Sequence, residues 1–217
     1  MMMRLLVCIF FNMFVWLPFA ASAEDGEPLR MGDMGPDFSL QDTRGQLQTL
    51  SSYRGKVVVL EWVNMACPAV RKHYSSGNMQ KNQLWAADHN VVWFSVSAPL
   101  DEGLKSPSTG SLDTALSEFK TGAYTTVMDI DGEVTRAYNV HRTPEFVILD
   151  AEGKIMYRGA ADDKPGDQKA DISEAEDYVR NAMKSLSDGK IPEPNKTSAY
   201  GCPLSKPKDE NERQWML

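Results

Sequence analysis

The chain has 217 residues, of which 42% are hydrophobic and 24% charged, and its formal net charge is −7 at pH 7. These are ordinary values for a globular protein with one core, so they exclude global disorder and a protein with several membrane spans. No basic run with interleaved aromatic residues occurs, which argues against a nucleic-acid partner because phosphate binding needs clustered Lys and Arg.

The first 23 residues are typical of a secretory signal peptide. Arg4 precedes an apolar run at 5–20, and the small residues at 21–23 (Ala-Ser-Ala) are followed by acidic ones. The run is short for a membrane-spanning helix, and the pattern predicts cleavage after residue 23. We therefore expect an exported protein, periplasmic or secreted, with no stable membrane insertion after cleavage. An uncleaved membrane anchor is the alternative.

The next elements are a hairpin and a buried strand. Short apolar pieces lie on either side of the sequence DTRG at 42–45, which predicts a β-hairpin near the N-terminus of the mature chain. The β-branched run at 57–60 then predicts a central strand that is covered on both faces and ends near Trp62.

A helix and a second strand follow. Residues 68–90 carry helix formers, with Pro68 at a favoured first-turn position, and the sequence SSGN at 75–78 is expected to break or kink this helix. A strand is expected at 91–98. Strand and helix therefore alternate, which is typical of an α/β domain.

The pattern continues to residue 190. The expected elements are a turn-rich loop at 99–111, a helix around 112–119, a strand at 125–130, a short helix at 131–140, strands at 145–150 and 154–160, and a last helix at 171–187. That helix places six apolar residues on one face: Ile172, Ala175, Val179, Ala182, Met183 and Leu186. Gly189 follows as a stop signal.

Together these elements predict an α/β fold with a central mixed sheet, flanking helices and an N-terminal β-hairpin. We divide the chain into a signal peptide at 1–23, a domain at 24–190 and an irregular, proline-rich tail at 191–217 that carries Cys202.

The mature chain would keep two of the three cysteines, Cys67 and Cys202, because Cys8 leaves with the signal peptide. In an oxidising compartment two thiols can form one disulfide. Its loop would span roughly 135 residues, and the chain-entropy model gives such a closure about 5 kcal/mol. A purely structural disulfide is therefore one interpretation of this pair.

Cys67 lies where the buried strand gives way to a helix, the kind of junction at which sites gather in α/β sheets. A helix N-terminus favours a thiolate, and a pKa of about 6 would make a thiol roughly 90% ionised at neutral pH. We therefore expect this junction to expose and ionise Cys67. Arg71, Lys72 and His73 could assist this ionisation, although surface Lys and Arg in a first turn are usually solvated. The carboxylates at 162–163 could also be functional, but adjacent carboxylates after a strand are usually part of a solvated turn.

Four segments carry a family resemblance: GPDFSLQDTRGQLQTLSSYRGKVVVLEW at 35–62, CPAVRKHY at 67–74, RTPEFVILDAEGKIMYRGAADD at 142–163 and YGCP at 200–203. They resemble the redoxin branch of the thioredoxin superfamily, and within it the peroxiredoxin-like group. The resemblance spans about residues 33–203. It implies a thioredoxin-like fold and a redox-active cysteine.

Cys67 occupies the position of the reactive cysteine in this resemblance, and Pro68 follows it. Thr143 and Pro144 match the threonine and cis-proline that thioredoxin-like proteins place opposite that cysteine. The adjacent resolving cysteine of thioredoxins is absent, because Val70 holds its place.

The resemblance to peroxiredoxins is incomplete around the same cysteine. The proline and the threonine of their motif are replaced by Leu60 and Asn64, although Asn64 could still donate a hydrogen bond to a peroxide or a thiolate. Arg142 and Arg158 are the candidates for the arginine that peroxiredoxins aim at the cysteine. Cys202 matches a cysteine near the end of this group and is the expected resolving thiol.

The resemblance implies a thiol oxidoreductase with a role in thiol exchange or antioxidant defence, and the signal-peptide pattern predicts that it is exported. Cys67 would attack a partner's disulfide or a small hydroperoxide, Cys202 would close an intramolecular disulfide, and an external dithiol would restore the pair. No cofactor and no metal are expected, and protein thiols or disulfides are the expected partners.

Two other interpretations stay open. The first is a non-catalytic binding or structural module in which Cys67 and Cys202 form a permanent disulfide. The second is a copper-binding protein that uses Cys67 and His73, since soft sulfur ligands suit Cu(I). The methionines that could assist are Met31, Met34 and Met65.

Overall fold

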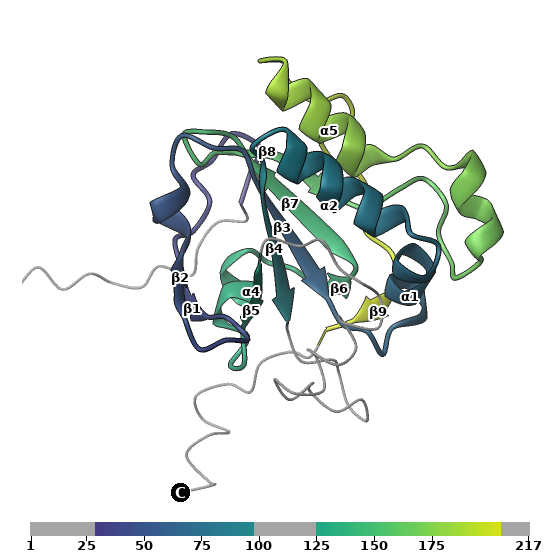
Figure 1. Ribbon diagram of the computed structural model, residues 1–217, viewed down its shortest axis with the longest axis horizontal. Coiled ribbons are helices and arrows are strands. Elements are labelled where there is room, and N and C mark those ends of the chain that lie inside the picture. Colours follow the sequence, from purple (N-terminus) through teal and green to yellow (C-terminus); the bar gives the residue numbers. More distant parts are fainter. Residues whose placement is uncertain (1–28, 98–124, 205–217) are drawn as a thin grey trace, which may run out of the picture.

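The computed structural model describes residues 29–97 and 125–204, and a five-stranded sheet forms its centre (Figure 1). The strands are, in spatial order, β5 (Thr125–Met128), β4 (Val92–Ser97), β3 (Val58–Val63), β7 (Glu145–Leu149) and β8 (Ile155–Gly159). The pairs β3–β4 and β4–β5 are parallel, whereas β3–β7 and β7–β8 are antiparallel. The predicted α/β fold with a central mixed sheet is confirmed.

The expected hairpin is present near the start of the described chain. It consists of β1 (Ser39–Gln41) and β2 (Leu47–Thr49), paired antiparallel, and a 3₁₀ turn at Leu50–Tyr53 follows. Asp42 closes the connecting turn because its Oδ1 accepts hydrogen bonds from the backbone N–H groups of Arg44 and Gln46, both at 2.9 Å. A short aspartate side chain of this kind stabilises a turn locally.

Helices cover both faces of the sheet. The first two are α1 (Pro68–Ser75) and α2 (Asn78–Asp88), and the break between them falls in the predicted SSGN sequence, where Gly77 has φ +77°. The others are α4 (Glu133–Ala137) and α5 (Tyr178–Ser187). Figure 1 shows α2 and α5 side by side over one face of the sheet, and α4 near the hairpin away from them.

Strand β3 is buried along its whole length, as its β-branched sequence predicts. Its alternate residues enter two separate cores, because successive side chains of a strand point to opposite faces. Leu60 and Trp62 pack with the hairpin and α4, and Val59 and Val63 pack with α1, α2 and α5. Cys67 belongs to the second core, so the site lies on the face covered by these three helices.

The last helix begins later than its apolar pattern predicts. The N-terminal part of the predicted segment 171–187 is a 3₁₀ helix, Lys169–Glu174, and α5 starts only at Tyr178. Asp177 fixes this start, since its Oδ1 accepts a hydrogen bond from the Arg180 backbone N–H at 2.9 Å. The backbone N–H of Tyr178, the first residue of α5, donates a hydrogen bond to the carbonyl of Ala161, which lies outside the helix.

Three predictions lie outside the described residues: the signal peptide at 1–23, the loop at 99–111 and the helix around 112–119. Among the residues that are described, no helix is long and apolar enough to cross a membrane.

Candidate active site

Cys67 lies at the junction predicted for it, between the end of β3 and the first residue of α1. Its backbone is extended (φ −76°, ψ 125°), it is the N-cap of the helix, and Pro68 is the first helical residue. Proline suits that position because the first N–H groups of a helix have no intrahelical acceptor. The backbone N–H of Cys67 donates instead to the carbonyl of Asn64 at 3.0 Å, which closes the turn after the strand.

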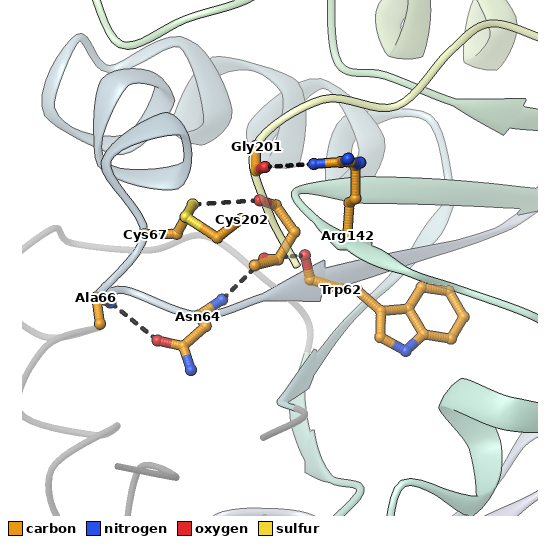
Figure 2. Close-up of a disulfide and its surroundings, with 8 residues drawn as sticks. Trp62, Asn64, Ala66, Cys67, Arg142, Gly201 and Cys202 are labelled. Carbon is orange, nitrogen blue, oxygen red and sulfur yellow. Dashed lines mark hydrogen bonds between the residues drawn. A yellow bond between two sulfur atoms is a disulfide. The ribbon is translucent and has the colours of Figure 1, made fainter. Parts of the chain in front are cut away.

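Cys67 and Cys202 form a disulfide, with their Cα atoms 5.8 Å apart (Figure 2). Cys67 has no solvent-exposed surface, whereas Cys202 is half-buried. The expectation of an exposed Cys67 is therefore wrong for this oxidised form, because the segment around Cys202 covers the helix N-terminus. Cys202 is thus the more exposed residue of the pair.

The segment that carries Cys202 is paired with the domain. Strand β9 (Cys202–Pro203), within the tail expected to be irregular, pairs antiparallel with β6 (Arg142–Thr143), and Thr143 lies opposite Cys202. Beyond β9 the backbone N–H of Leu204 donates to the carbonyl of His141 at 2.9 Å. These backbone contacts hold Cys202 against the edge that leads into β7.

Gly201 is required where the tail approaches β6. Its φ is +108°, in the region that favours glycine, and a Cβ there would lie 2.2 Å from the carbonyl oxygen of Thr143. A side chain at this position would push β9 away from β6 and so move Cys202.

Thr143 connects the end of β3 to this edge. Its Oγ1 donates to the carbonyl of Trp62 at 2.9 Å and accepts from the backbone N–H of Asn64 at 3.1 Å. Its carbonyl oxygen is 3.3 Å from Cys67 Sγ, a contact without a shared proton in the disulfide form, since neither sulfur carries a hydrogen. The bond to Pro144 is cis, as the family resemblance implies.

Asn64, another expected site residue, is 2% exposed. Its Oδ1 accepts from the backbone N–H of Ala66 at 2.9 Å, so the side chain supports the turn before Cys67 (Figure 2). Its Nδ2 is buried and has no hydrogen-bond partner among the described residues.

Neither candidate arginine is hydrogen-bonded to the reactive sulfur. One guanidinium N–H of Arg142 donates to the carbonyl of Gly201 at 3.0 Å (Figure 2). Arg158 forms an ion pair with Glu145 at 3.0 Å and also donates to the carbonyl of Asn139. Arg142 thus supports the Cys202 segment, and Arg158 supports the sheet edge.

Glu61 is a buried acid on the Cys67 side of β3 that the sequence analysis missed. It has no exposed surface, and its carboxylate accepts hydrogen bonds from Tyr74 Oη (2.9 and 3.0 Å) and Trp93 Nε1 (2.9 Å). Burial raises the pKa of Glu61 to about 7, against the opposing effect of these hydrogen bonds. The position of a charge inside the apolar run VVVLEWV was the available signal.

A second group of polar side chains lies between α1 and the tail, and we call it the Tyr200 cluster: Lys72, His73, Asp162 and Tyr200. Lys72, His73 and Asp162 are 0–2% exposed. Lys72 Nζ donates to Tyr200 Oη at 3.1 Å and to the carbonyl of Lys164 at 2.6 Å. The prediction that Lys72 and Asp162 are solvated is therefore wrong.

His73 is held neutral in this cluster. Burial lowers the pKa of His73 to about 4, with Asp162 opposing and Lys72 reinforcing the shift. Its Nε2 is 2.9 Å from Tyr200 Oη, and its Nδ1 is 3.3 Å from Asn78 Nδ2. Both ring nitrogens are thus occupied by protein partners.

The copper-binding interpretation gains no support from these positions. The sulfur of Cys67 is bonded to Cys202, and His73 makes the two contacts just described. Within 29–97 and 125–204, no group of three or more His, Cys, Asp and Glu residues is arranged to hold a metal ion.

The sequence profile of the redoxin family matches residues 30–179. The chain belongs to the redoxin family. The matched range contains Cys67, Thr143 and Pro144 but ends before Cys202, so the second cysteine of the disulfide lies outside it. No curated protein sequence matches the chain significantly.

Solved structures share the fold of this redoxin. An uncharacterized conserved protein from Geobacillus kaustophilus has a TM-score of 0.71 and 20% sequence identity, over 83% of this chain and 95% of that one. A hypothetical protein from Sinorhizobium meliloti has a TM-score of 0.68 and 20% identity, over 82% and 95%. The thioredoxin domain of a thiol-disulfide oxidoreductase from Bacteroides vulgatus has a TM-score of 0.50 and 22% identity, over 67% and 96%.

These likenesses confirm the thioredoxin-like fold, and the profile match confirms the redoxin branch. In general terms the protein is therefore a thiol oxidoreductase of the thioredoxin superfamily.

Proposed function

We propose that this redoxin is an exported thiol–disulfide oxidoreductase in which Cys67 is the nucleophile and Cys202 the resolving thiol. The observation that carries the proposal is the disulfide between these two residues, formed at a helix N-terminus beside the cis-proline. Export is supported by the signal-peptide pattern at 1–23 and agrees with a disulfide between distant cysteines.

The chemistry begins with the reduced protein. The Cys67 thiolate attacks one sulfur of a partner's disulfide, forms a mixed disulfide and releases the partner's first thiolate. The Cys202 thiolate then attacks the Cys67 sulfur and releases the second partner thiolate. The partner gains two electrons, and the protein loses two as its disulfide closes.

An external dithiol restores the reduced pair, and the sulfur of the half-buried Cys202 is its point of attack. Cys67 has no exposed surface, so a thiolate that approaches from solvent reaches Cys202 first. Cys67 then leaves as the thiolate at the N-terminus of α1, where the helix dipole and unpaired N–H groups stabilise negative charge. A stabilised leaving group speeds this exchange.

Disulfide exchange fits the site better than hydroperoxide reduction. The peroxiredoxin motif is interrupted at Leu60 and Asn64. Among the described residues, Arg142 and Arg158 are engaged with Gly201 and Glu145 instead. Neither arginine is therefore available as a positively charged partner for a peroxide.

The test is to mix reduced protein with a disulfide-containing peptide, and separately with hydrogen peroxide, under stopped flow with mass spectrometry of quenched samples. We expect rapid exchange with the peptide that ends in the Cys67–Cys202 bond, and slow reaction with peroxide. The Cys202→Ser variant should accumulate a mixed disulfide at Cys67. The proposal is wrong if Cys202→Ser turns over reductant as fast as the wild type, or if only peroxide reacts rapidly.

A further inference from the structure

The Tyr200 cluster joins the two elements that carry the cysteines. Lys72 and His73 lie on α1, the helix that begins directly after Cys67, and Tyr200 precedes Cys202 by two residues. The fourth member, Asp162, follows β8, an edge strand of the central sheet. The cluster is therefore a second attachment of the tail to the domain, beside the β6–β9 pair.

The hydroxyl of Tyr200 is the centre of this cluster, because its oxygen contacts all three other members. Its proton goes to Asp162 Oδ1, because a carboxylate accepts hydrogen bonds and donates none. Lys72 Nζ donates to the hydroxyl oxygen at 3.1 Å, and His73 Nε2 lies 2.9 Å from it. Since the tyrosine proton is already donated, the proton of neutral His73 is assigned to Nε2, and Nδ1 accepts from Asn78.

If the Tyr200 side chain moved out of the cluster, the buried Lys72 and Asp162 would each lose a hydrogen-bond partner. Asp162 Oδ2 has no hydrogen bond among the described residues and lies 3.7 Å from Lys72 Nζ and 3.9 Å from His73 Nε2. The side chains of Lys72 and Asp162 are 0% and 1% exposed. A buried ion pair is stable only when hydrogen bonds satisfy its remaining atoms, so movement of Tyr200 is unfavourable.

Tyr200 can transmit this restraint to Cys202 because the chain between them is also held. Arg142 donates to the carbonyl of Gly201, and Cys202 pairs with Thr143. The ring of Tyr200 additionally lies over Lys72, with Nζ 4.9 Å from the ring centroid. The tail is thus fixed on both sides of Gly201.

We propose that Tyr200 is a positioning residue whose hydroxyl, held by Lys72, His73 and Asp162, keeps Cys202 beside Cys67 and favours disulfide closure over persistence of a mixed disulfide. The inference rests on the proposed function, since it concerns the resolving step of that cycle. With glutathione disulfide as oxidant, Cys67 first forms a mixed disulfide and releases one glutathione. Cys202 then displaces the second glutathione, so two protein thiols are oxidised and one glutathione disulfide is reduced.

The experiment equilibrates the full-length protein in a buffer of glutathione and glutathione disulfide, quenches it with acid and counts both species by mass spectrometry. In Tyr200→Phe, which keeps the ring and removes only the hydroxyl, we expect the ratio of intramolecular disulfide to Cys67–glutathione mixed disulfide to fall about tenfold. A tenfold change in the equilibrium constant of the intramolecular pair corresponds to about 30 mV in its reduction potential.

Tyr138→Phe is the matched control. Tyr138 is also buried, and its hydroxyl donates to the carbonyl of Pro36 at 2.8 Å, in the other core. This variant loses a hydrogen bond that goes to Pro36 and not to the tail, so its disulfide ratio should equal that of the wild type. A fall in both variants would mean a general effect of lost stability and would overturn the inference, as would an unchanged ratio in Tyr200→Phe.

A second variant keeps the test decisive if Tyr200→Phe does not fold. The double variant Lys72→Met and Asp162→Asn removes both charges and keeps the phenol, and it should also increase the mixed disulfide. An unchanged ratio would contradict a role for the cluster. These ratios do not depend on any protein partner. If the wild type reduces no disulfide peptide but Tyr200→Phe still shifts the ratio, the proposed function fails and the positioning role stands.

Discussion

Removal of the buried Glu61 carboxyl should make the free energy of unfolding depend on pH between 5 and 7, where that of the wild type is nearly constant. In the folded protein burial raises the pKa of Glu61 from 4.5 to about 7, and burial lowers the pKa of His73 from 6.5 to about 4. Both groups are fully buried, and their effects on the free energy of unfolding fall in the same pH interval with opposite signs. The free energy of unfolding of the wild type therefore changes with pH by the difference between the Glu61 effect and the His73 effect.

The signs follow from proton linkage. Folded Glu61 keeps a proton that the unfolded chain releases, so its contribution is present below about pH 4.5 and is lost as pH rises through about 7. Folded His73 lacks a proton that the unfolded chain binds, so its contribution is present above about pH 6.5 and is lost as pH falls toward about 4. Between pH 5 and 7 each effect amounts to about 2 kcal/mol, at 1.36 kcal/mol per pKa unit.

The assay is urea unfolding of the oxidised protein at several pH values between 5 and 7. We expect the free energy of unfolding of the wild type to be nearly constant, because the two contributions cancel. Glu61→Gln should lose about 2 kcal/mol as pH falls from 7 to 5, since only the His73 effect remains. The matched variant His73→Gln should show the opposite slope. If Glu61→Gln gave a profile parallel to that of the wild type, the buried, protonatable state of Glu61 would be refuted.

Three further outcomes are expected. Gly201→Ala should lower the free energy of unfolding of the oxidised protein by at least about 2 kcal/mol, because its Cβ would meet the Thr143 carbonyl at positive φ; equal urea midpoints would contradict the close approach. Thr143→Val should cost about 2 kcal/mol by removing the Oγ1 that bridges Trp62 and Asn64, and Thr143→Ser should restore most of it. The mature protein isolated from an exporting host should begin at Glu24, and an intact N-terminus would exclude cleavage after residue 23.

The sequence predicted the local elements well where one periodicity dominated. The run at 57–60 leads into β3 (Val58–Val63), which is fully buried, and α1 ends at Ser75, within the predicted break. The start of α5 was wrong because the apolar positions of Ile172 and Ala175 fit a helix, whereas the Asp177 cap and the Ala161 carbonyl stop it at Tyr178. Capping is a local side-chain effect that apolar periodicity does not report.

The site could be predicted only in part, for the same kind of reason. Cys67 and the Thr143–Pro144 pair were visible as motif positions, and the structure brings them together. The burial of Lys72 was not visible, because it depends on Tyr200, which lies 128 residues away along the chain. Sequence spacing gives no information on such a long-range partner, so a charged side chain on a short helix was expected to face solvent.

The reduction potential of the Cys67–Cys202 pair tests the central claim most directly, since a working redox pair must open and close in its compartment. The measurement equilibrates the protein with dithiothreitol buffers and follows the disulfide by thiol alkylation and mass spectrometry. We predict a potential above about −300 mV, within reach of an external dithiol. A potential well below about −300 mV would show a permanent structural disulfide and would contradict the catalytic role of the pair.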